Sequence, residues 1–364
     1  MKKNYVLILL FLFFSFLLGA QNINEDFQEN PNVLSLYNLA EKYREEGNFK
    51  KGIEIYHSLL VKFEKNYNKE HFYYGIYLSN LAGLYKKMGN YSSALPLYVE
   101  ALENTEKALG KDHTKYGIRL NNLASLYQDM GNYSAALPLY VEALENTEKA
   151  LGKDHKSYGI RLNNLAVCYE NMGNYSAALP LYVEALENTE KALGKDHKSY
   201  GIRLNNLAGL YQHMGNYSAA LPLYMEALEN TEKALGKDHS DYGTRLNNLA
   251  VCYENMGNYS AALPLYMEAI ENTDKALGKD HADYGTHLNN LAGLYKKMGN
   301  YSSALPLYVE ALKNTEKALG KDHSYYGIRL NNLAGLYYKM GNYSSALPLY
   351  MDCLLYTSPS PRDA

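Results

Sequence analysis

The side chains with the most obvious chemistry are histidines that recur in the tripeptide Lys-Asp-His. They are His113, His155, His197, His239, His281 and His323. A zinc site needs several ligands about 2.0–2.3 Å from one ion. If the recurrence reflects packed helix pairs, equivalent points on neighbouring pairs should lie about 10 Å apart or more. Each histidine then has one aspartate beside it, so we expect a structural or solvent-exposed loop role and no bound metal.

Two of the three cysteines also occupy equivalent positions. Cys168 and Cys252 stand where other copies of the same segment have Leu126, Leu210 or Leu294. A thiol that alternates with leucine behaves as a small core hydrophobe. No glycine-rich phosphate loop, Cys/His pair or isolated Ser/His/Asp set stands out. We therefore predict no catalytic site and no cofactor in this chain.

Charge and the N-terminal residues limit the class of protein. The net charge is −3 and the sequence pI about 6.4, which disfavours a nucleic-acid-binding surface because that needs a strongly basic face. Residues 1–20 combine a short basic start, an apolar run over 6–18 and a small Gly-Ala end, which is typical of a secretory signal peptide. We expect a secreted or periplasmic protein with no membrane segment beyond this signal. An uncleaved N-terminal anchor is the alternative.

A repeat of 42 residues organises the rest of the chain. It is marked by Gly47, Gly89, Gly131, Gly173, Gly215, Gly257, Gly299 and Gly341. A fixed period of this size indicates a solenoid built from one supersecondary unit. One unit runs from Lys111 to Gly152, and no strand-like alternation occurs in it.

Each unit contains two apolar stripes with helical spacing. The first comprises Tyr116, Leu120, Leu123, Ala124, Tyr127 and Met130. The second comprises Ala136, Leu137, Tyr140, Ala143, Leu144, Thr147 and Leu151. The pattern predicts two antiparallel helices, and the small residues Ala124 and Ala136 should let them approach closely.

The residues between the stripes predict how the helices begin and end. Gly131 should end the first helix in the left-handed conformation, and the glycosylation-like sequence 132–134 is expected to be a turn. Asp112 or Thr114 can supply the N-cap oxygen of the first helix. Pro138 should lie near the first turn of the second helix, where backbone amides lack intrahelical partners.

These features resemble the tetratricopeptide repeat. The matching pattern is Leu120, Leu123-Ala124, Tyr127, Gly131-Asn132-Tyr133, Ala136, Tyr140 and Ala143, and the 42-residue period is similar to the kinesin-light-chain-type subclass. The resemblance implies an all-α fold, an α-solenoid in which antiparallel helix pairs form a right-handed superhelix. It covers residues 70–352 strongly, as about seven repeats of which the last is truncated, and residues 21–69 weakly, as a linker and a degenerate N-terminal capping repeat.

The last residues depart from the repeat. Where earlier copies have methionine after this tyrosine they continue as Met-Glu-Ala, at residues 225–227 and 267–269, whereas this chain ends in MDCLLYTSPSPRDA. Cys353 to Asp363 is the direct translation of a DNA string that closely resembles the transposase adapter used in sequencing libraries. We therefore interpret residues 353–364 as a sequencing-adapter artefact and expect the natural protein to continue beyond this point.

The resemblance also implies a binding surface. In that family the first helices line a concave groove that holds partner peptides, often with asparagine contacting the peptide backbone. The residues that vary between copies lie close to the recurring Asn-Asn pair, whereas two of the second helices are identical. Drift among recent duplications is the alternative explanation of this variation. Carried over, the groove residues are Asn121, Asn122, Ser125, Gln128, Asn163, Asn164, Val167, Glu170, Asn205, Asn206, Gln212, Asn247, Asn248, Glu254, Asn289, Asn290 and Lys296.

Three functions are compatible with this sequence. The first is an exported, non-catalytic scaffold that binds a protein or peptide ligand in its groove. The second is the recruiting or sensor arm of a larger enzyme, because a signal peptide followed by such an array resembles bacterial proteins that end in a caspase-like CHAT protease domain. The third is a spacer that associates with itself.

Overall fold

The computed structural model describes residues 31–357, in which the regular structure is helical throughout. The expected signal peptide lies outside this range, and the expected non-native segment 353–364 begins inside the last helix and ends outside it. The first helices of the pairs are α2 (Pro31–Glu45), α4 (Phe72–Lys87), α6 (Thr114–Asp129), α8 (Lys156–Asn171), α10 (Lys198–His213), α12 (Ser240–Asn255), α14 (Ala282–Lys297) and α16 (Ser324–Lys339). The second helices are α3 (Phe49–Asn66), α5 (Tyr91–Leu109), α7 (Tyr133–Leu151), α9 (Tyr175–Leu193), α11 (Tyr217–Leu235), α13 (Tyr259–Leu277), α15 (Tyr301–Leu319) and α17 (Tyr343–Thr357).

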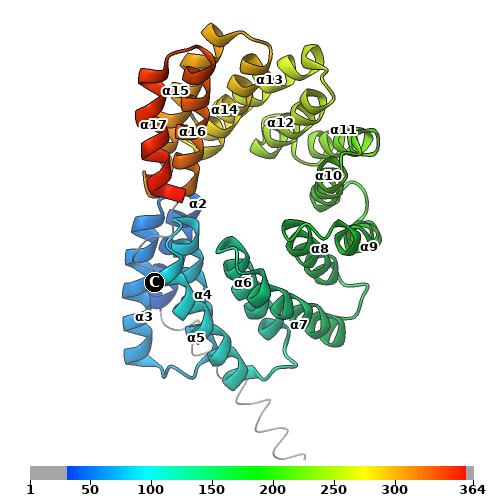
Figure 1. The fold of residues 1–364 in the computed structure, drawn as a ribbon. Helices are drawn as coiled ribbons and strands as arrows, with labels where there is room; N and C mark the ends of the chain where they lie inside the picture. Colours follow the sequence, from blue (N-terminus) through cyan, green and yellow to red (C-terminus); the bar gives the residue numbers. More distant parts are fainter. Residues whose placement is uncertain (1–30, 358–364) are drawn as a thin grey trace, which may run out of the picture. The chain divides into compact units, whose positions relative to one another are not determined.

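The helices form two compact units, Met1–Leu126 and Tyr127–Ala364, divided inside α6. In the second unit α9, α11, α13 and α15 each pack against the first helix of their own pair and against the first helix of the next pair. First helices of successive pairs also contact each other, as α10 does with α12 and α12 with α14, and they lie on the inner side of the bend in this unit (Figure 1). The predicted all-α solenoid of helix pairs is confirmed.

The turn inside each pair follows the glycine and asparagine of the repeat. Gly173 ends α8 with φ 74°, in the left-handed region that glycine adopts without a Cβ clash. Asn174 then caps α9, because its side-chain oxygen accepts hydrogen bonds from the Ala177 amide at 3.2 Å and the Ser176 hydroxyl at 3.0 Å. The Asn-Tyr-Ser sequence therefore makes a capped turn, as predicted.

The cap of the first helices differs from the prediction. The N-cap of α10 is His197, whose Nδ1 accepts a hydrogen bond from the Ser199 amide at 3.1 Å. At the start of α6 the same contact joins His113 Nδ1 to the Lys115 amide at 3.1 Å, so the expected caps Asp112 and Thr114 were wrong. An imidazole nitrogen can replace the usual oxygen because the neutral ring carries one acceptor. The recurring histidines thus have a defined structural role.

The proline of the second helix is also placed differently. Because α7 begins at Tyr133, Pro138 is the sixth residue of the helix and lies beyond the first turn. Its missing amide leaves the carbonyl of Ser134 without its intrahelical donor. Both residues are exposed, so water can reach that carbonyl.

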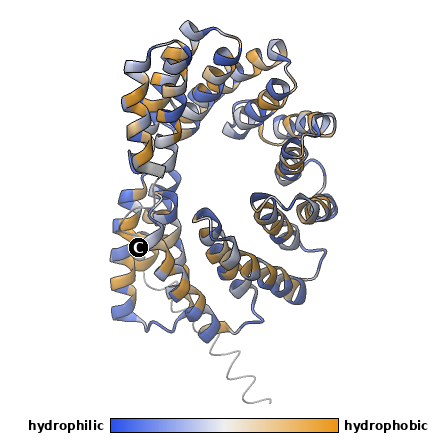
Figure 2. Cartoon of the chain, in the orientation of Figure 1, coloured by the Kyte–Doolittle hydropathy of each residue, from blue (hydrophilic) through white to orange (hydrophobic). Residues whose placement is uncertain are grey.

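Apolar contacts between pairs form a repeated core. In the second unit Ala166, Ala178 and Tyr182 of one pair pack against Leu207 and Leu210 of the next. Hydrophobic residues run as stripes along the helices, while hydrophilic residues gather at helix ends and loops (Figure 2). The predicted stripe residues are largely buried, except for Met130 and Leu151 at helix ends, which are 43% and 38% exposed.

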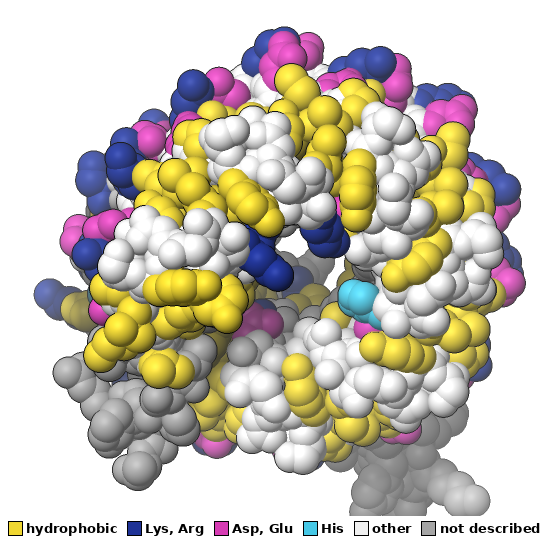
Figure 3. All heavy atoms as spheres, turned by 45° about the horizontal axis from the view of Figure 1, so that its top comes forward, with side chains coloured by type: hydrophobic (Ala, Val, Ile, Leu, Met, Phe, Trp, Pro, Cys, Tyr) yellow, Lys and Arg dark blue, Asp and Glu magenta, His cyan; other side chains and the backbone are white. Residues whose placement is uncertain are grey.

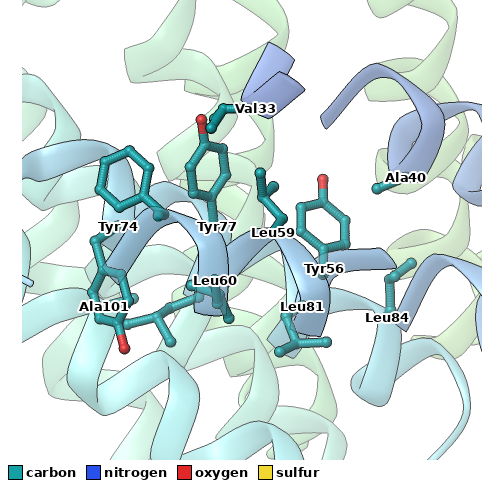
Figure 4. Packing of buried hydrophobic residues seen from close by; sticks show 12 residues of the cluster. Val33, Ala40, Tyr56, Leu59, Leu60, Tyr74, Tyr77, Leu81, Leu84 and Ala101 are labelled. Carbon is teal, nitrogen blue, oxygen red and sulfur yellow. The ribbon is translucent and has the colours of Figure 1, made fainter. Parts of the chain in front are cut away.

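The core of the first unit is richer in aromatic residues. Tyr56, Leu59, Tyr77 and Leu81 lie together between α3 and α4 with at most 1% exposure (Figure 4). Phe63 packs edge-on against Tyr77 at a ring-centroid distance of 5.4 Å. These large side chains join the degenerate first pair to the second pair through a shared core.

Replacing one small residue tests the helix packing. Ala178 is fully buried in a cluster with Ala166. We expect Ala178→Leu to overpack this contact and lower the free energy of unfolding by about 1–3 kcal/mol. Urea denaturation followed by circular dichroism measures the change, and an unaltered midpoint would contradict the close approach.

In the pairs α4/α5, α8/α9, α10/α11 and α12/α13 a buried asparagine of the second helix bonds to the backbone at the start of the first helix. In α11 the Asn230 side chain accepts a hydrogen bond from the Gly201 amide at 2.9 Å and donates one to the Lys195 carbonyl at 2.5 Å. A Cβ at Gly201 would lie 2.3 Å from Asn230 Oδ1. We call these two hydrogen bonds the latch, and it requires glycine at position 201. The equivalent latch in the preceding pair joins Asn188 to the Gly159 amide and the Lys153 carbonyl.

Candidate functional site

One narrow strip of each first helix in the second unit remains accessible to solvent. In α8 it comprises Ile160, Asn164, Val167 and Asn171, at intervals of four, three and four residues, while most of the rest of the helix is buried. We call the equivalent strips of α8, α10, α12, α14 and α16 the first-helix face. It is the surface of the second unit on which the first helices approach each other.

Asparagines link the repeats along this face. The second asparagine of each pair donates from Nδ2 to Oδ1 of the first asparagine in the preceding repeat. The bonds are Asn206 to Asn163 at 2.9 Å, Asn248 to Asn205 at 2.9 Å, Asn290 to Asn247 at 3.0 Å and Asn332 to Asn289 at 2.9 Å. In the first unit Asn122 Nδ2 donates to Ser79 Oγ at 3.2 Å. This ladder fixes the register of neighbouring first helices.

The structure separates the proposed groove residues into two groups. Buried by their neighbours are Asn121, Asn163, Asn247 and Asn289. Half-buried are Asn122, Ser125, Gln128, Asn164, Val167, Glu170, Asn205, Asn206, Gln212, Asn248, Glu254, Asn290 and Lys296. Of the whole set, 121, 122 and 125 belong to the first unit and the others to the second. Of the two groups, only the half-buried one has side-chain surface that is accessible from outside the repeats, and Asn163, Asn247 and Asn289 of the buried group accept hydrogen bonds from the next repeat.

Glutamates beside the face connect one pair to the next. Glu254 accepts from the Tyr266 hydroxyl at 2.5 Å and forms an ion pair with Lys297 Nζ at 2.8 Å. Glu170 makes the equivalent bonds to Tyr182 at 2.5 Å and to His213 Nδ1 at 2.8 Å. The pKa of Tyr266 is raised, mainly by burial, so its hydroxyl is a hydrogen-bond donor at neutral pH. The sequence analysis did not predict that Tyr182 and Tyr266 bond to these glutamates, although the constant spacing of 12 residues between glutamate and tyrosine could have indicated it.

Buried arginines lie in the same helices. Arg161, Arg203 and Arg245 are each 8% exposed, and their Nε atoms have no hydrogen-bond partner among the described residues. Burial lowers the pKa of Arg161 and Arg203 to about 10. Sequence analysis missed them because arginine is usually exposed, yet Arg161 lies three residues after the buried Tyr158 and four before the buried Leu165. That spacing places it on the buried stripe.

A histidine in this arginine position predicts a pH dependence. His287 is 3% exposed and its Nδ1 lies 3.0 Å from Thr273 Oγ1; burial is the main cause that lowers its pKa, with Asp283 opposing. The unfolded chain then binds more protons below about pH 6.5, so stability should fall as pH drops from there towards the folded-state pKa. Chemical denaturation at pH 7.5, 6.5 and 5.5 measures this.

His287→Arg is the matched control for that dependence, because sibling repeats carry arginine there. The variant should show a shallower loss of stability on acidification. Part of the slope should remain, since burial also lowers the pKa of His71 and His323. Identical slopes for the two proteins would contradict the assignment to His287.

The outer edge of the repeats carries paired charges. Lys191 Nζ lies 2.7 Å from Asp154, and Lys233 lies 2.7 Å from Asp196. Basic and acidic side chains neighbour each other along this outside surface (Figure 3). Exposed pairs of this kind contribute little stability. Within residues 31–357 no cluster of three or more His, Cys, Asp or Glu side chains could hold a metal ion, and no helix has the length and apolar character to span a bilayer.

Comparison with known proteins agrees with the repeat. A family model described as tetratricopeptide repeat matches seven overlapping segments, residues 32–107, 77–149, 117–191, 161–233, 202–275, 246–317 and 283–354. The comparison with curated proteins gave no match.

Among solved structures, a Rap protein complexed with Competence and Sporulation Factor is 14% identical, with a TM-score of 0.57 over 89% of this chain and 97% of that chain. The apo form of RapI is 16% identical, with a TM-score of 0.56 over 78% and 97%. A putative kinesin light chain of Podosopora anserina with nearly identical TPR-like repeats is 23% identical, with a TM-score of 0.48 over 56% and 97%. At these identities the similarity to Rap and RapI concerns the fold.

Proposed function

Because the chain belongs to the tetratricopeptide repeat family, we propose that it is a non-catalytic scaffold that holds a peptide or protein segment against the first-helix face. The observation that carries the proposal is where successive repeats differ. Helices α7 and α9 are identical, whereas α8 and α10 differ at four positions. Three of the four, those of Val167, Glu170 and Asn171 in α8, lie on or beside the first-helix face.

The chemistry of that face suits a polypeptide. It presents amide groups from each repeat next to apolar patches such as Ile160 and Val167, and amides can bond to an extended peptide backbone whatever its sequence. The Rap structure of similar fold was solved with Competence and Sporulation Factor, so in that protein the fold accommodates a bound factor.

Export is the second part of the proposal. It rests on residues 1–20, whose basic start and apolar run are those of a signal peptide. Fractionation of cells that express the tagged full chain, with and without these residues, tests it. Equal amounts in the cytoplasm for both forms would contradict export.

Selection from a random dodecapeptide display library tests binding. The wild-type chain should enrich specific sequences. Val167→Arg with Val251→Arg places two long charged side chains on the face and should abolish the enrichment. Val183→Arg with Met225→Arg is the control, because these residues lie on second helices and are 36% and 51% exposed. Loss of enrichment in the control alone, or in neither variant, would count against the first-helix face.

A further inference from the structure

Glycine interrupts the first-helix face in α10, α14 and α16, whereas α8 and α12 have valine at the same position. Val167 and Val251 are replaced by Gly209 in α10 and Gly293 in α14. A Cβ at Gly209 would lie 3.6 Å from the Tyr224 hydroxyl, and one at Gly293 would lie 3.6 Å from the Tyr308 hydroxyl. Each glycine therefore leaves a tyrosine hydroxyl without a covering side chain. We call Gly209 with Tyr224 the first notch and Gly293 with Tyr308 the second notch.

These two hydroxyls differ from those of the valine-containing pairs. Tyr182 and Tyr266 are at most 1% exposed and donate to Glu170 and Glu254. Tyr224 and Tyr308 are 4% exposed, and no group in residues 31–357 forms a hydrogen bond with either hydroxyl. Neither hydroxyl is among the fully buried atoms that lack a partner, so water reaches both, and a ligand group can replace that water if it forms an equivalent hydrogen bond.

A second unpaired atom belongs to the first notch. Gln212 takes the position that Glu170 has in the preceding pair, where the carboxylate bonds to tyrosine. Its side-chain oxygen is buried and has no hydrogen-bond partner among the described residues. The Gln212 residue is half-buried as a whole, so a change of its side-chain rotamer can bring this oxygen to a group seated in the first notch beside the Tyr224 hydroxyl.

The charges around each notch are of both signs. Glu170 and Arg245 act with opposite sign on the Tyr224 hydroxyl, as Glu254 and Arg329 do on Tyr308. Burial is the main cause that raises the pKa of Tyr308 to about 12, so the hydroxyl keeps its proton at neutral pH. A ligand group of either charge is opposed by one neighbour, whereas a neutral group that both donates and accepts is opposed by none.

The chain itself shows that the equivalent space in α16 admits the end of a side chain. Lys296 reaches from α14 towards Gly335, so that its Nζ would lie 3.0 Å from a Cβ built there. The polar end of a long side chain therefore occupies the place that valine fills in α8. The first and second notches have no such occupant from the preceding pair, because Glu170 and Glu254 are bonded to Tyr182 and Tyr266.

We propose, on the basis of the proposed function, that the two notches are subsites for primary carboxamides, the asparagine or glutamine side chains of the bound peptide. The carboxamide oxygen accepts from the tyrosine hydroxyl. In the first notch the NH₂ group donates to Gln212. In the second notch Lys296 takes the position of Gln212, and the acceptor we propose is the Glu254 carboxylate of the preceding pair, whose charge acts on the Tyr308 hydroxyl. The ligand is then an extended segment with two carboxamide residues separated by the length of two repeats.

The test uses peptides that the wild-type chain selects from the random dodecapeptide library. We expect asparagine or glutamine at two positions, and about tenfold or greater weakening of Kd, by fluorescence anisotropy, when both are replaced by leucine or glutamate. Gly209→Val with Gly293→Val, which copies the sibling repeats, should weaken the selected peptide by a similar factor. Tyr224→Phe with Tyr308→Phe should do the same without changing side-chain volume.

The possible outcomes distinguish the carboxamide subsites from peptide binding itself. Selected peptides that lack paired carboxamides, or that bind both double variants as tightly as wild type, would overturn the inference and leave peptide binding intact; the notches would then hold only water. A library that yields no enriched sequence on wild type would overturn both. Circular dichroism of each variant confirms that it is folded.

Discussion

Gly201→Ala should be strongly destabilising although it exchanges glycine for the best helix former. The added Cβ would lie 2.3 Å from the Asn230 side-chain oxygen and 3.3 Å from the Ala227 carbonyl. The asparagine must then leave its bonds to the Gly201 amide and the Lys195 carbonyl while it remains buried. Two unsatisfied buried groups at about 1–3 kcal/mol each give an expected loss of about 2–6 kcal/mol. Urea denaturation followed by circular dichroism measures it.

The same helix supplies the control for that variant. Gly209 also lies inside α10, but a Cβ there meets only the Tyr224 hydroxyl at an ordinary 3.6 Å. Gly209→Ala should therefore be neutral or stabilising by up to about 1 kcal/mol, the helix-propensity difference. Adding Asn230→Ala to Gly201→Ala should recover part of the loss by removing the clash, as expected for residues in contact. A similar effect of the two glycine variants would show that the latch does not hold the pair together.

The repeat predicts the fold well because its signals are local. Apolar spacing in Tyr116 to Tyr127 identifies a helix, and Gly131 with Asn132 marks its end, without knowledge of any distant residue. A period of 42 residues then requires neighbouring units to pack alike. These arguments lead to the observed helix pairs with little further information.

What the sequence did not predict depends on contacts between distant residues. The role of Asn230 requires knowing that it approaches Gly201, and 29 residues separate them. The asparagine is identical in the six copies from Asn104 to Asn314, so the regular repeats give no contrast by which its role could be recognised. The histidine caps were missed for a different reason, because Asp112 and Thr114 are the more usual capping residues and lie on either side of His113.

The asparagine pairs show how far the candidate site could be predicted. From hydropathy alone Asn163 and Asn164 cannot be distinguished, because they are equally polar, and both are predicted to lie on the polar side of the helix. Consecutive residues of a helix point about 100° apart, so one of them can face the preceding pair and the other the next. Asn163 is 5% exposed and accepts from Asn206, while Asn164 is half-buried on the first-helix face. Only the packing of neighbouring repeats distinguishes them.

Tyr266→Phe should also lower the free energy of unfolding. Pairs with valine on the first-helix face differ from pairs with glycine in the hydrogen bonding of this tyrosine as well as in shape. The Tyr266 hydroxyl is fully buried and donates to Glu254 at 2.5 Å. Without it the Glu254 side chain, which is 10% exposed, keeps only the ion pair with Lys297. A hydrogen bond to a charged group contributes about 1.5–3 kcal/mol, and we expect a loss of that size in the free energy of unfolding.

Tyr308→Phe is the matched comparison, since it makes the same atomic change one repeat later. The Tyr308 hydroxyl has no hydrogen-bond partner in residues 31–357, so its removal breaks no bond within the protein. The change should cost less than about 0.5 kcal/mol, as for substitutions away from buried networks. Equal losses for the two variants in urea denaturation would mean that the Glu254 bond adds nothing beyond the packing of the ring. A large loss for Tyr308→Phe alone would show that its hydroxyl is already satisfied within the folded chain, and the second notch would have nothing to offer a ligand.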